Sequence, residues 1–184
     1  MHVIEHAFDG QVQVFEPTVH GDARGSFFES FRADKLAALG LHGPWVQDNQ
    51  SLSQRGVLRG LHFQWDEPQG KLVRVGRGRA LDVVVDLRAG SPSFGAWKAF
   101  ELDAVAHHQV WVPPGFGHGF LALEGDTQLL YKCTAVYNAA GEGNIHPFDP
   151  EIGIDWGLSG DEIQLSARDA AAQSLADYAQ APRF

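Results

Sequence analysis

The segment Gly56-Val57-Leu58-Arg59-Gly60-Leu61-His62-Phe63-Gln64 is short, mostly apolar and opened by glycine, a pattern that indicates a β-strand. Arg59 and His62 stand out in it as polar residues. They are three residues apart, so a regular strand would place them on opposite faces, but Gly60 between them can host a bulge that turns both toward one cavity. A cation and an imidazole together are costly in a core and useful in a site.

Segments of the same kind recur along the chain and predict ten short strands, at residues 12–15, 25–31, 45–51, 56–64, 71–75, 80–87, 96–102, 109–112, 119–123 and 128–137. This spacing predicts a sandwich or a barrel. Two helices are expected, one over 33–39 that ends at Gly40 and one over 167–179 with Ser166 as its N-cap. We therefore expect one all-β domain spanning residues 1–184, with a helical tail at about 166–180.

The formal net charge of -9, without long runs of one sign, argues against nucleic acid and anionic membranes as partners, because both need a basic patch. No window approaches the roughly 20 apolar residues that span a bilayer, and the N-terminus has no signal-peptide pattern. The single cysteine, Cys133, excludes an intramolecular disulfide and fits a cytoplasmic protein. It lies in an apolar strand pattern, so we expect an inert core residue.

A metal site is the first chemistry to test, because metal-binding small barrels carry a His-x-His pair, a Glu and a distant His. Here the pair would be His62-Phe63-Gln64, so the second histidine is missing. His62 and His118 alone are too few ligands for a dedicated zinc or iron site. No Gly-x-Ser-x-Gly or phosphate-binding glycine motif occurs either. We expect neither a metal nor another cofactor.

Several polar residues in strand-like segments suit another reaction; they are Arg59, His62, Lys71, Asp82, His118 and Tyr131. A histidine base, a tyrosine acid and a lysine that holds negative charge would support proton abstraction beside a carbonyl, with inversion at carbon. Tyr131 and Tyr137 share one face of the predicted strand 128–137, with only small residues between them. They are either neighbours of a ligand or core tyrosines with satisfied hydroxyls.

The chain resembles the dTDP-4-keto-6-deoxyglucose 3,5-epimerases of the rhamnose pathway over about residues 8–175. The matching motifs are Gly21-Asp22-Ala23-Arg24-Gly25-Ser26-Phe27-Phe28-Glu29, Gln47-Asp48-Asn49-Gln50-Ser51, the 56–64 segment, Gln69-Gly70-Lys71-Leu72-Val73, Asp82-Val83-Val84-Val85-Asp86-Leu87-Arg88, Pro114-Gly115-Phe116-Gly117-His118-Gly119-Phe120, Asp149-Pro150 and Leu165-Ser166-Ala167-Arg168-Asp169. The resemblance implies a cupin-type jelly-roll barrel (double-stranded β-helix) with short flanking helices. It also implies a cofactor-independent isomerase that converts dTDP-4-keto-6-deoxy-D-glucose to dTDP-4-keto-L-rhamnose.

The resemblance also implies roles for individual residues. His62 would be the base that removes the C3 and C5 protons, with Asp169 hydrogen-bonded to it. Tyr131 would be the acid on the opposite face, and Lys71 would help to hold the enolate. Further positions match substrate contacts: Arg24, Glu29, Gln47 and Asn49 for the nucleotide across a homodimer interface, Tyr137 for stacking on thymine, and Arg59, His118, Glu142 and Arg168 for the rest of the substrate.

Other interpretations stay open at several positions. Ser166 and Asp169 read by themselves as a Ser-x-x-Asp capping box, and both readings can hold. Arg24 and Glu29 could be a surface ion pair on a hairpin. Asp82 must have a partner if it is buried, in either a structural or a supporting role at the site. Asp86 and Arg88 are expected to form a structural pair at a strand end.

Three departures from the family pattern leave room for a different sugar. The loop 65–69 looks one residue short, Arg168 stands where Lys is frequent, and Gly157 stands where Pro is usual. A variant that inverts C3 or C5 alone therefore remains an alternative. A non-catalytic sugar-nucleotide-binding barrel and a metal-dependent cupin are two further alternatives, which the intact catalytic set and the missing ligands disfavour.

Overall fold

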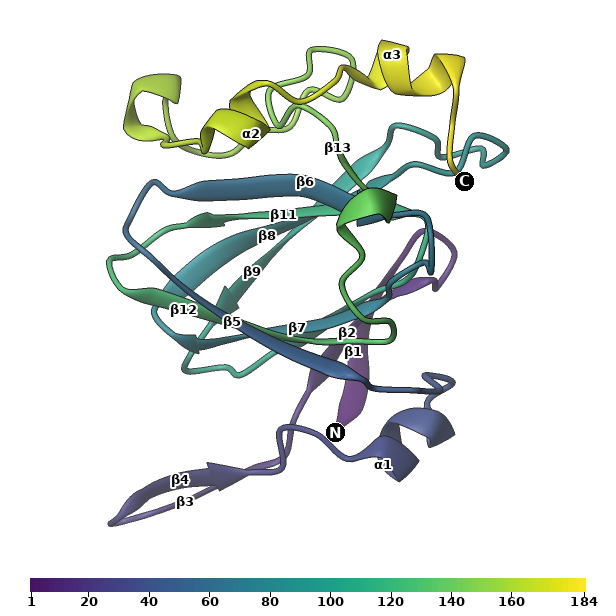
Figure 1. Cartoon of the computed structure of the whole chain (residues 1–184). Helices are drawn as coiled ribbons and strands as arrows, with labels where there is room; N and C mark the ends of the chain where they lie inside the picture. The colour runs from purple at the N-terminus through teal and green to yellow at the C-terminus, as the bar shows by residue number, and fades with distance from the viewer.

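The computed structural model describes all 184 residues and consists of two facing antiparallel sheets with short helices outside them (Figure 1). The prediction of an all-β jelly-roll barrel with short flanking helices is confirmed. The first sheet has six strands in the order β1 (His2–Ala7), β2 (Val12–Glu16), β10 (Gln109–Val112), β7 (Lys71–Arg77), β12 (Thr127–Cys133) and β5 (Gln47–Ser53). The second has five, in the order β13 (Glu142–Asn144), β6 (Leu58–Gln64), β11 (Phe116–Ala122), β8 (Arg79–Asp86) and β9 (Trp97–Asp103).

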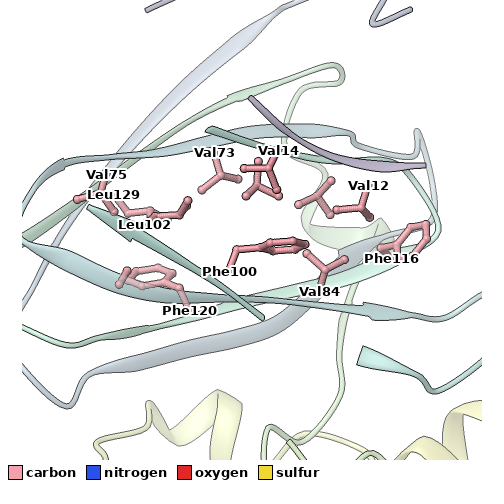
Figure 2. Packing of buried hydrophobic residues seen from close by; sticks show 13 residues of the cluster. Val12, Val14, Val73, Val75, Val84, Phe100, Leu102, Phe116, Phe120 and Leu129 are labelled. Atoms are coloured by element: carbon pink, nitrogen blue, oxygen red, sulfur yellow. The ribbon is translucent and has the colours of Figure 1, made fainter. Parts of the chain in front are cut away.

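Alternation along the strands fills the space between the sheets with apolar side chains. Val73 and Leu129 come from the first sheet, and Phe100 and Phe120 face them from the second (Figure 2). These residues belong to a cluster of 13 buried side chains. Tyr131 packs against the edge of this cluster and is only partly buried. The apolar core therefore ends near Tyr131, and the polar side chains of the barrel interior lie beyond it.

The C-terminal segment covers the outer face of the second sheet (Figure 1). Leu61 and Phe63 of β6 pack there with Trp156 and Tyr178. The Tyr178 hydroxyl donates a hydrogen bond to the Leu87 carbonyl at 2.9 Å. On the outside of the first sheet, the short helix α1 (Ala33–Ala38) is held by a smaller apolar cluster. The C-terminal packing fixes the residues near 166–169 against β6, which is where the site forms.

The predicted helix over 167–179 is wrong, because the tail contains two separate short helices. They are α2 (Ala167–Ala170) and α3 (Leu175–Gln180). Between them the chain is extended, and Gln173 accepts a backbone hydrogen bond from His146 at 2.8 Å. Ser174 then starts α3 with a capping box. The predicted N-cap at Ser166 is confirmed, since its side chain accepts from the Asp169 amide.

Several strand predictions also need correction. β1, β13 and the strand β3 (Val19–Asp22) were not expected, and β12 ends at Cys133 instead of continuing to residue 137. β3 pairs with β4 (Gly25–Phe28) in a hairpin that extends away from the barrel (Figure 1). Two short 3-10 turns lie at Ala139–Gly141 and Gly160–Glu162. None of the helices has the length and hydrophobicity needed to cross a membrane.

Candidate active site

The centre of the site is an irregularity in β6. His62 lies opposite His118 of β11, and Arg59 lies opposite Phe120, so the register shifts by one residue between them. Gly60 takes a φ of 130°, and a Cβ there would stand 2.5 Å from the Gly119 Cα. Only glycine allows the two strands to approach this closely. As predicted, Arg59 and His62 line the same pocket, of about 330 Å³.

His62 is hydrogen-bonded to Asp169, with 2.6 Å between Nε2 and Oδ1. The contact implied by the resemblance is therefore present, between residues 107 positions apart. The His62 side chain is 28% exposed and that of Asp169 is 4% exposed. Burial would raise the pKa of Asp169, but the hydrogen bonds with His62 and Ser166 outweigh it, and the pKa is lowered. Asp169 therefore stays an anionic partner for His62, whose Nδ1 has no protein partner.

Only half of the expected capping box forms. The Asp169 amide donates to Ser166 Oγ at 3.1 Å, as the motif predicts. The Asp169 carboxylate does not return to the Ser166 amide, because it bonds His62 instead. The first turn of α2 therefore both caps the helix and places the carboxylate behind the imidazole.

Tyr131 and Lys71 face the barrel interior from the sheet opposite His62. They lie on neighbouring strands, where Cys133 pairs with Lys71 and Tyr131 with Val73. Burial raises the pKa of Tyr131, which keeps the phenol protonated. Burial lowers the pKa of Lys71, whose amine makes no ion pair or hydrogen bond within the protein. The site thus places an acid and an unpaired amine across the barrel from the histidine.

A second histidine–carboxylate pair lies beside the first. His118 Nε2 and Asp82 Oδ2 are 2.8 Å apart. The side chains are 7% and 0% exposed, so this pair is more deeply buried than His62 and Asp169. The expectation that a buried Asp82 has a partner is confirmed. Its other oxygen, Oδ1, is buried without any hydrogen bond.

Three predicted substrate contacts meet at the mouth of the barrel. Glu142 Oε2 accepts from the Tyr137 hydroxyl at 2.8 Å and from Arg168 at 2.7 Å. Asn144, which was not predicted, donates to the Arg168 backbone carbonyl at 3.1 Å. Tyr137 lies beyond the end of β12 and is exposed, so the prediction that it shares a strand face with Tyr131 is wrong. An exposed ring is free to meet a planar base.

The four residues expected to bind the nucleotide fall into two groups. Gln47 and Asn49 lie on β5 and are joined at 3.0 Å, and Asn49 also donates to Cys133 Sγ at 3.4 Å. Arg24 lies on the protruding hairpin, where it pairs with Asp22. Glu29 lies just beyond the hairpin and pairs with Lys35 and Arg32. The suggested Arg24–Glu29 ion pair is therefore wrong.

Besides Asn144, two further residues contribute to the site beyond what the sequence predicted. Ser53 accepts from Arg59 Nε at 3.2 Å and orients it. Cys133 is buried, as expected, and it also touches Asn49 and lies opposite Lys71, so it forms part of the wall of the site. No group of three or more His, Cys, Asp or Glu side chains is arranged to hold a metal ion. The expected pair of Asp86 and Arg88 forms at 2.6 Å, away from the site.

This arrangement can move protons on two faces of one bound molecule. His62, held by Asp169, is a base that faces an open pocket. Tyr131, on the opposite sheet, is an acid kept protonated by burial. The unpaired Lys71 amine lies beside Tyr131 and can stabilise negative charge.

The chain is similar to known proteins along nearly its whole length. A family model described as dTDP-4-dehydrorhamnose 3,5-epimerase matches residues 7–177. The dTDP-4-dehydrorhamnose 3,5-epimerase of Salmonella typhimurium is 48% identical over 166 residues, covering 89% of this chain and 90% of that protein.

Solved structures show the same similarity. The dTDP-6-deoxy-D-glucose-3,5-epimerase RmlC of Legionella pneumophila, in complex with dTDP-4-keto-L-rhamnose, superposes with a TM-score of 0.91 and 45% identity, over 95% of this chain and 93% of that one. ChmJ, a 3'-monoepimerase of Streptomyces bikiniensis in complex with dTDP-quinovose, superposes with a TM-score of 0.87 and 38% identity, over 98% of this chain and 90% of that one.

Proposed function

The chain belongs to the dTDP-4-dehydrorhamnose 3,5-epimerase family and is an isomerase of that family, and we propose that His62, Asp169, Tyr131 and Lys71 carry out its reaction. The substrate is dTDP-4-keto-6-deoxy-D-glucose, and the product of inversion at C3 and C5 is dTDP-4-keto-L-rhamnose. The observation that carries the residue assignment is the His62–Asp169 hydrogen bond, which lies across the barrel from a tyrosine kept protonated by burial.

Each inversion breaks one carbon–hydrogen bond and makes another. His62 takes the proton from C3 or C5, and the electron pair moves through the adjacent carbon–carbon bond, so that the C4 carbonyl becomes an enolate. Lys71 stabilises the charge on that oxygen. Tyr131 then donates its proton to the carbon from the opposite face, and the enolate returns to the ketone. Tyr131 and His62 regain their starting states by exchange with water.

Deuterium incorporation tests this mechanism. In D2O the wild-type protein should place deuterium at both C3 and C5 of the sugar, because a proton from solvent replaces each one removed. His62→Asn should abolish the exchange, while His42→Asn, at an exposed histidine away from the site, should leave it intact. Exchange at one carbon alone would identify a mono-epimerase, the activity named for ChmJ. Full exchange in His62→Asn would remove His62 as the base.

The protein also acts as a homodimer in this proposal, with Arg24 and Glu29 serving the partner's site. The hairpin β3–β4 extends away from the barrel, and Arg24 on it is exposed (Figure 1). Phe27 on the same hairpin is 72% exposed, an apolar side chain suited to contact with a second copy. Gln47 and Asn49 lie on β5 of the barrel, and in this proposal Arg24 and Glu29 of a second copy complete the nucleotide site around them.

Mixing two inactive variants tests this arrangement. His62→Asn and Arg24→Ala should each be nearly inactive, and exchange of subunits should restore activity, because one site of the mixed dimer then has both wild-type residues. If Arg24 serves its own chain, the mixed dimer has no intact site and activity does not return. Light scattering of the wild-type protein should give the mass of a dimer.

A further inference from the structure

The loop after β12 is a short irregular segment, residues 134–138, and it carries Tyr137. Backbone groups of this loop bond to glutamine side chains from other parts of the barrel. Gln69 donates to the Ala135 carbonyl at 2.7 Å, and Gln47 accepts from the Tyr137 amide at 2.7 Å. Since residues 134–138 belong to no strand or helix, the position of the loop depends on these side chains.

Gln64 makes the most contacts with this loop. Its side-chain amide donates to the Val136 carbonyl at 3.0 Å and accepts from the Asn138 amide at 2.9 Å, on either side of Tyr137. It also donates to the Glu67 carbonyl at 2.7 Å, which joins the loop after β6 to the loop after β12. Gln64 is 4% exposed, and both hydrogens of its amide are used. It therefore has no donor left for a ligand and acts on the loop.

Tyr137 is exposed and yet held at both ends. Its backbone lies between the two groups that Gln64 bonds, and its hydroxyl donates to Glu142 Oε2 at 2.8 Å. Glu142 on β13 pairs with Gln64 on β6, so both ends of the tyrosine are held from the same end of β6. The residue is nevertheless 53% exposed. A ring fixed in this way loses little conformational freedom when a ligand binds.

We propose that Gln64 is a positioning residue for nucleotide binding, which holds the loop so that the Tyr137 ring is already placed to stack on a base. This inference rests on the proposed function, whose substrate carries thymine, a planar ring that an exposed tyrosine can stack on. The proton transfers belong to His62 and Tyr131, and Gln64 forms a hydrogen bond with neither. Gln64 therefore sets the affinity for the nucleotide and not the rate at which bound substrate reacts.

The variant Gln64→Met tests the proposal, because methionine has a similar volume and makes none of the three hydrogen bonds. The Kd of dTDP, measured by calorimetry, should rise about 3- to 10-fold, since the ring then has to be ordered on binding. KM for the sugar nucleotide should rise with it, and kcat should stay within about twofold.

Thr127→Val is the matched control for a purely structural role. The buried Thr127 hydroxyl donates to the Glu124 carbonyl at 2.9 Å and so holds a loop at the other end of β12. Its loss should lower Tm and leave Kd and KM unchanged. If Gln64→Met behaves in the same way, Gln64 only stabilises the fold and the proposal is wrong.

A double-mutant cycle shows whether Gln64 acts through Tyr137. Tyr137→Ala should raise the Kd of dTDP about 10- to 100-fold, the usual contribution of stacking on a base, and Gln64→Met should add nothing in the double variant. Additive losses, or an unchanged Kd in either single variant, would overturn the proposal. So would a fall in kcat with an unchanged KM.

A second variant loosens the same loop from another side. If Gln64→Met does not fold, Gln69→Met, which frees the loop at Ala135, decides by the same criteria. Binding of dTDP does not depend on turnover, so these measurements stand apart from the test of the reaction. Absence of deuterium exchange in the wild type would instead refute the proposed function.

Discussion

Two histidine–carboxylate pairs stand side by side in this barrel and have the same atoms in contact. In each, the histidine Nε2 meets one carboxylate oxygen, at 2.6 Å in His62–Asp169 and at 2.8 Å in His118–Asp82. The two histidines are strand neighbours on β6 and β11. They differ in their surroundings, since His62 lines an open pocket and His118 is almost completely buried.

This difference in exposure shows that the same kind of histidine–carboxylate pair can have two different roles in one protein. A base has to release its proton to water after each turnover, so it needs the exposure that His62 has. His118 and Asp82 lack that exposure, so their pair is suited to holding side chains in place within the barrel and not to exchanging protons with water. The carboxylates follow the same division: Asp169 comes from the covering segment outside the barrel, and Asp82 from a central strand.

The largest expected loss of kcat comes from disrupting the more exposed pair, His62–Asp169. In Asp169→Asn the amide can present its N–H to His62 Nε2, which stabilises the wrong tautomer of the imidazole. We expect kcat to fall by about 10²- to 10⁴-fold, the usual contribution of a general base. Steady-state kinetics and deuterium exchange measure it. A loss of less than about tenfold would argue against His62 acting as a base that Asp169 supports.

Asp86 is a third buried carboxylate, and its substitution should change the stability of the fold without changing catalysis. Its hydrogen bonds with Arg88, Ser91 and Ser93 outweigh burial and lower its pKa to about 2. A lowered carboxyl pKa stabilises the fold above the unfolded-state value, and this stability is lost as the pH falls toward 2. The shift from 3.8 to about 2 corresponds to about 2 kcal/mol.

The variant Asp86→Asn should therefore be less stable than the wild type by about 2 kcal/mol or more at pH 7, and the difference should shrink below about pH 4. Urea unfolding at several pH values measures this. The value of kcat at pH 7 should stay unchanged, because neither histidine contacts Asp86. An equal loss of stability at all pH values would mean that packing, not charge, is what the carboxylate contributes.

The sequence predicted local features of the site better than its long-range contacts. The bulge at Gly60 follows from one residue that alone fits the conformation, so it could be expected without any partner strand. The pairing of His118 with Asp82 depends on the register between β11 and β8, which no local pattern contains. The Asp169 contact spans 107 residues and came only from the family resemblance.

The errors in the fold have a similar origin. The apolar alternation of β12 continues past Cys133, so the strand was extended to Tyr137, yet β5 and β7 pair with it only up to Cys133. Residues 167–179 have helical propensity throughout, but the pairing of Gln173 with the chain near Ile145 overrides it. In both cases tertiary contacts, and not local sequence preference, determined where the strand or helix ends.

The alkaline limb of the pH profile tests the groups that face the two histidines from the other sheet, Lys71 and Tyr131. Burial lowers the pKa of Lys71 from its ordinary 10.5 and raises that of Tyr131 from 10.0. The proposed reaction needs both groups protonated, so activity should fall at high pH, and the lowered pKa brings the loss of the Lys71 proton closer to neutral pH. In Lys71→Arg the guanidinium keeps its charge at alkaline pH, so the limb should move to higher pH, at a lower maximal rate. A limb that stays in place would exclude Lys71 as its cause.

The smallest expected effect distinguishes two roles of Ser166, which are to hold Asp169 beside His62 and to cap the helix α2. Ser166 caps α2 through the Asp169 amide, and Ser174 caps α3 in the same way through Asp177. Ser166→Ala and Ser174→Ala should each cost about 1 kcal/mol of stability, measured by urea unfolding. Only Ser166 holds the turn that carries the carboxylate, so only its loss should lower kcat, by a few-fold. Equal kcat values in the two variants would show that packing of the tail on β6, and not the cap, places Asp169 behind His62.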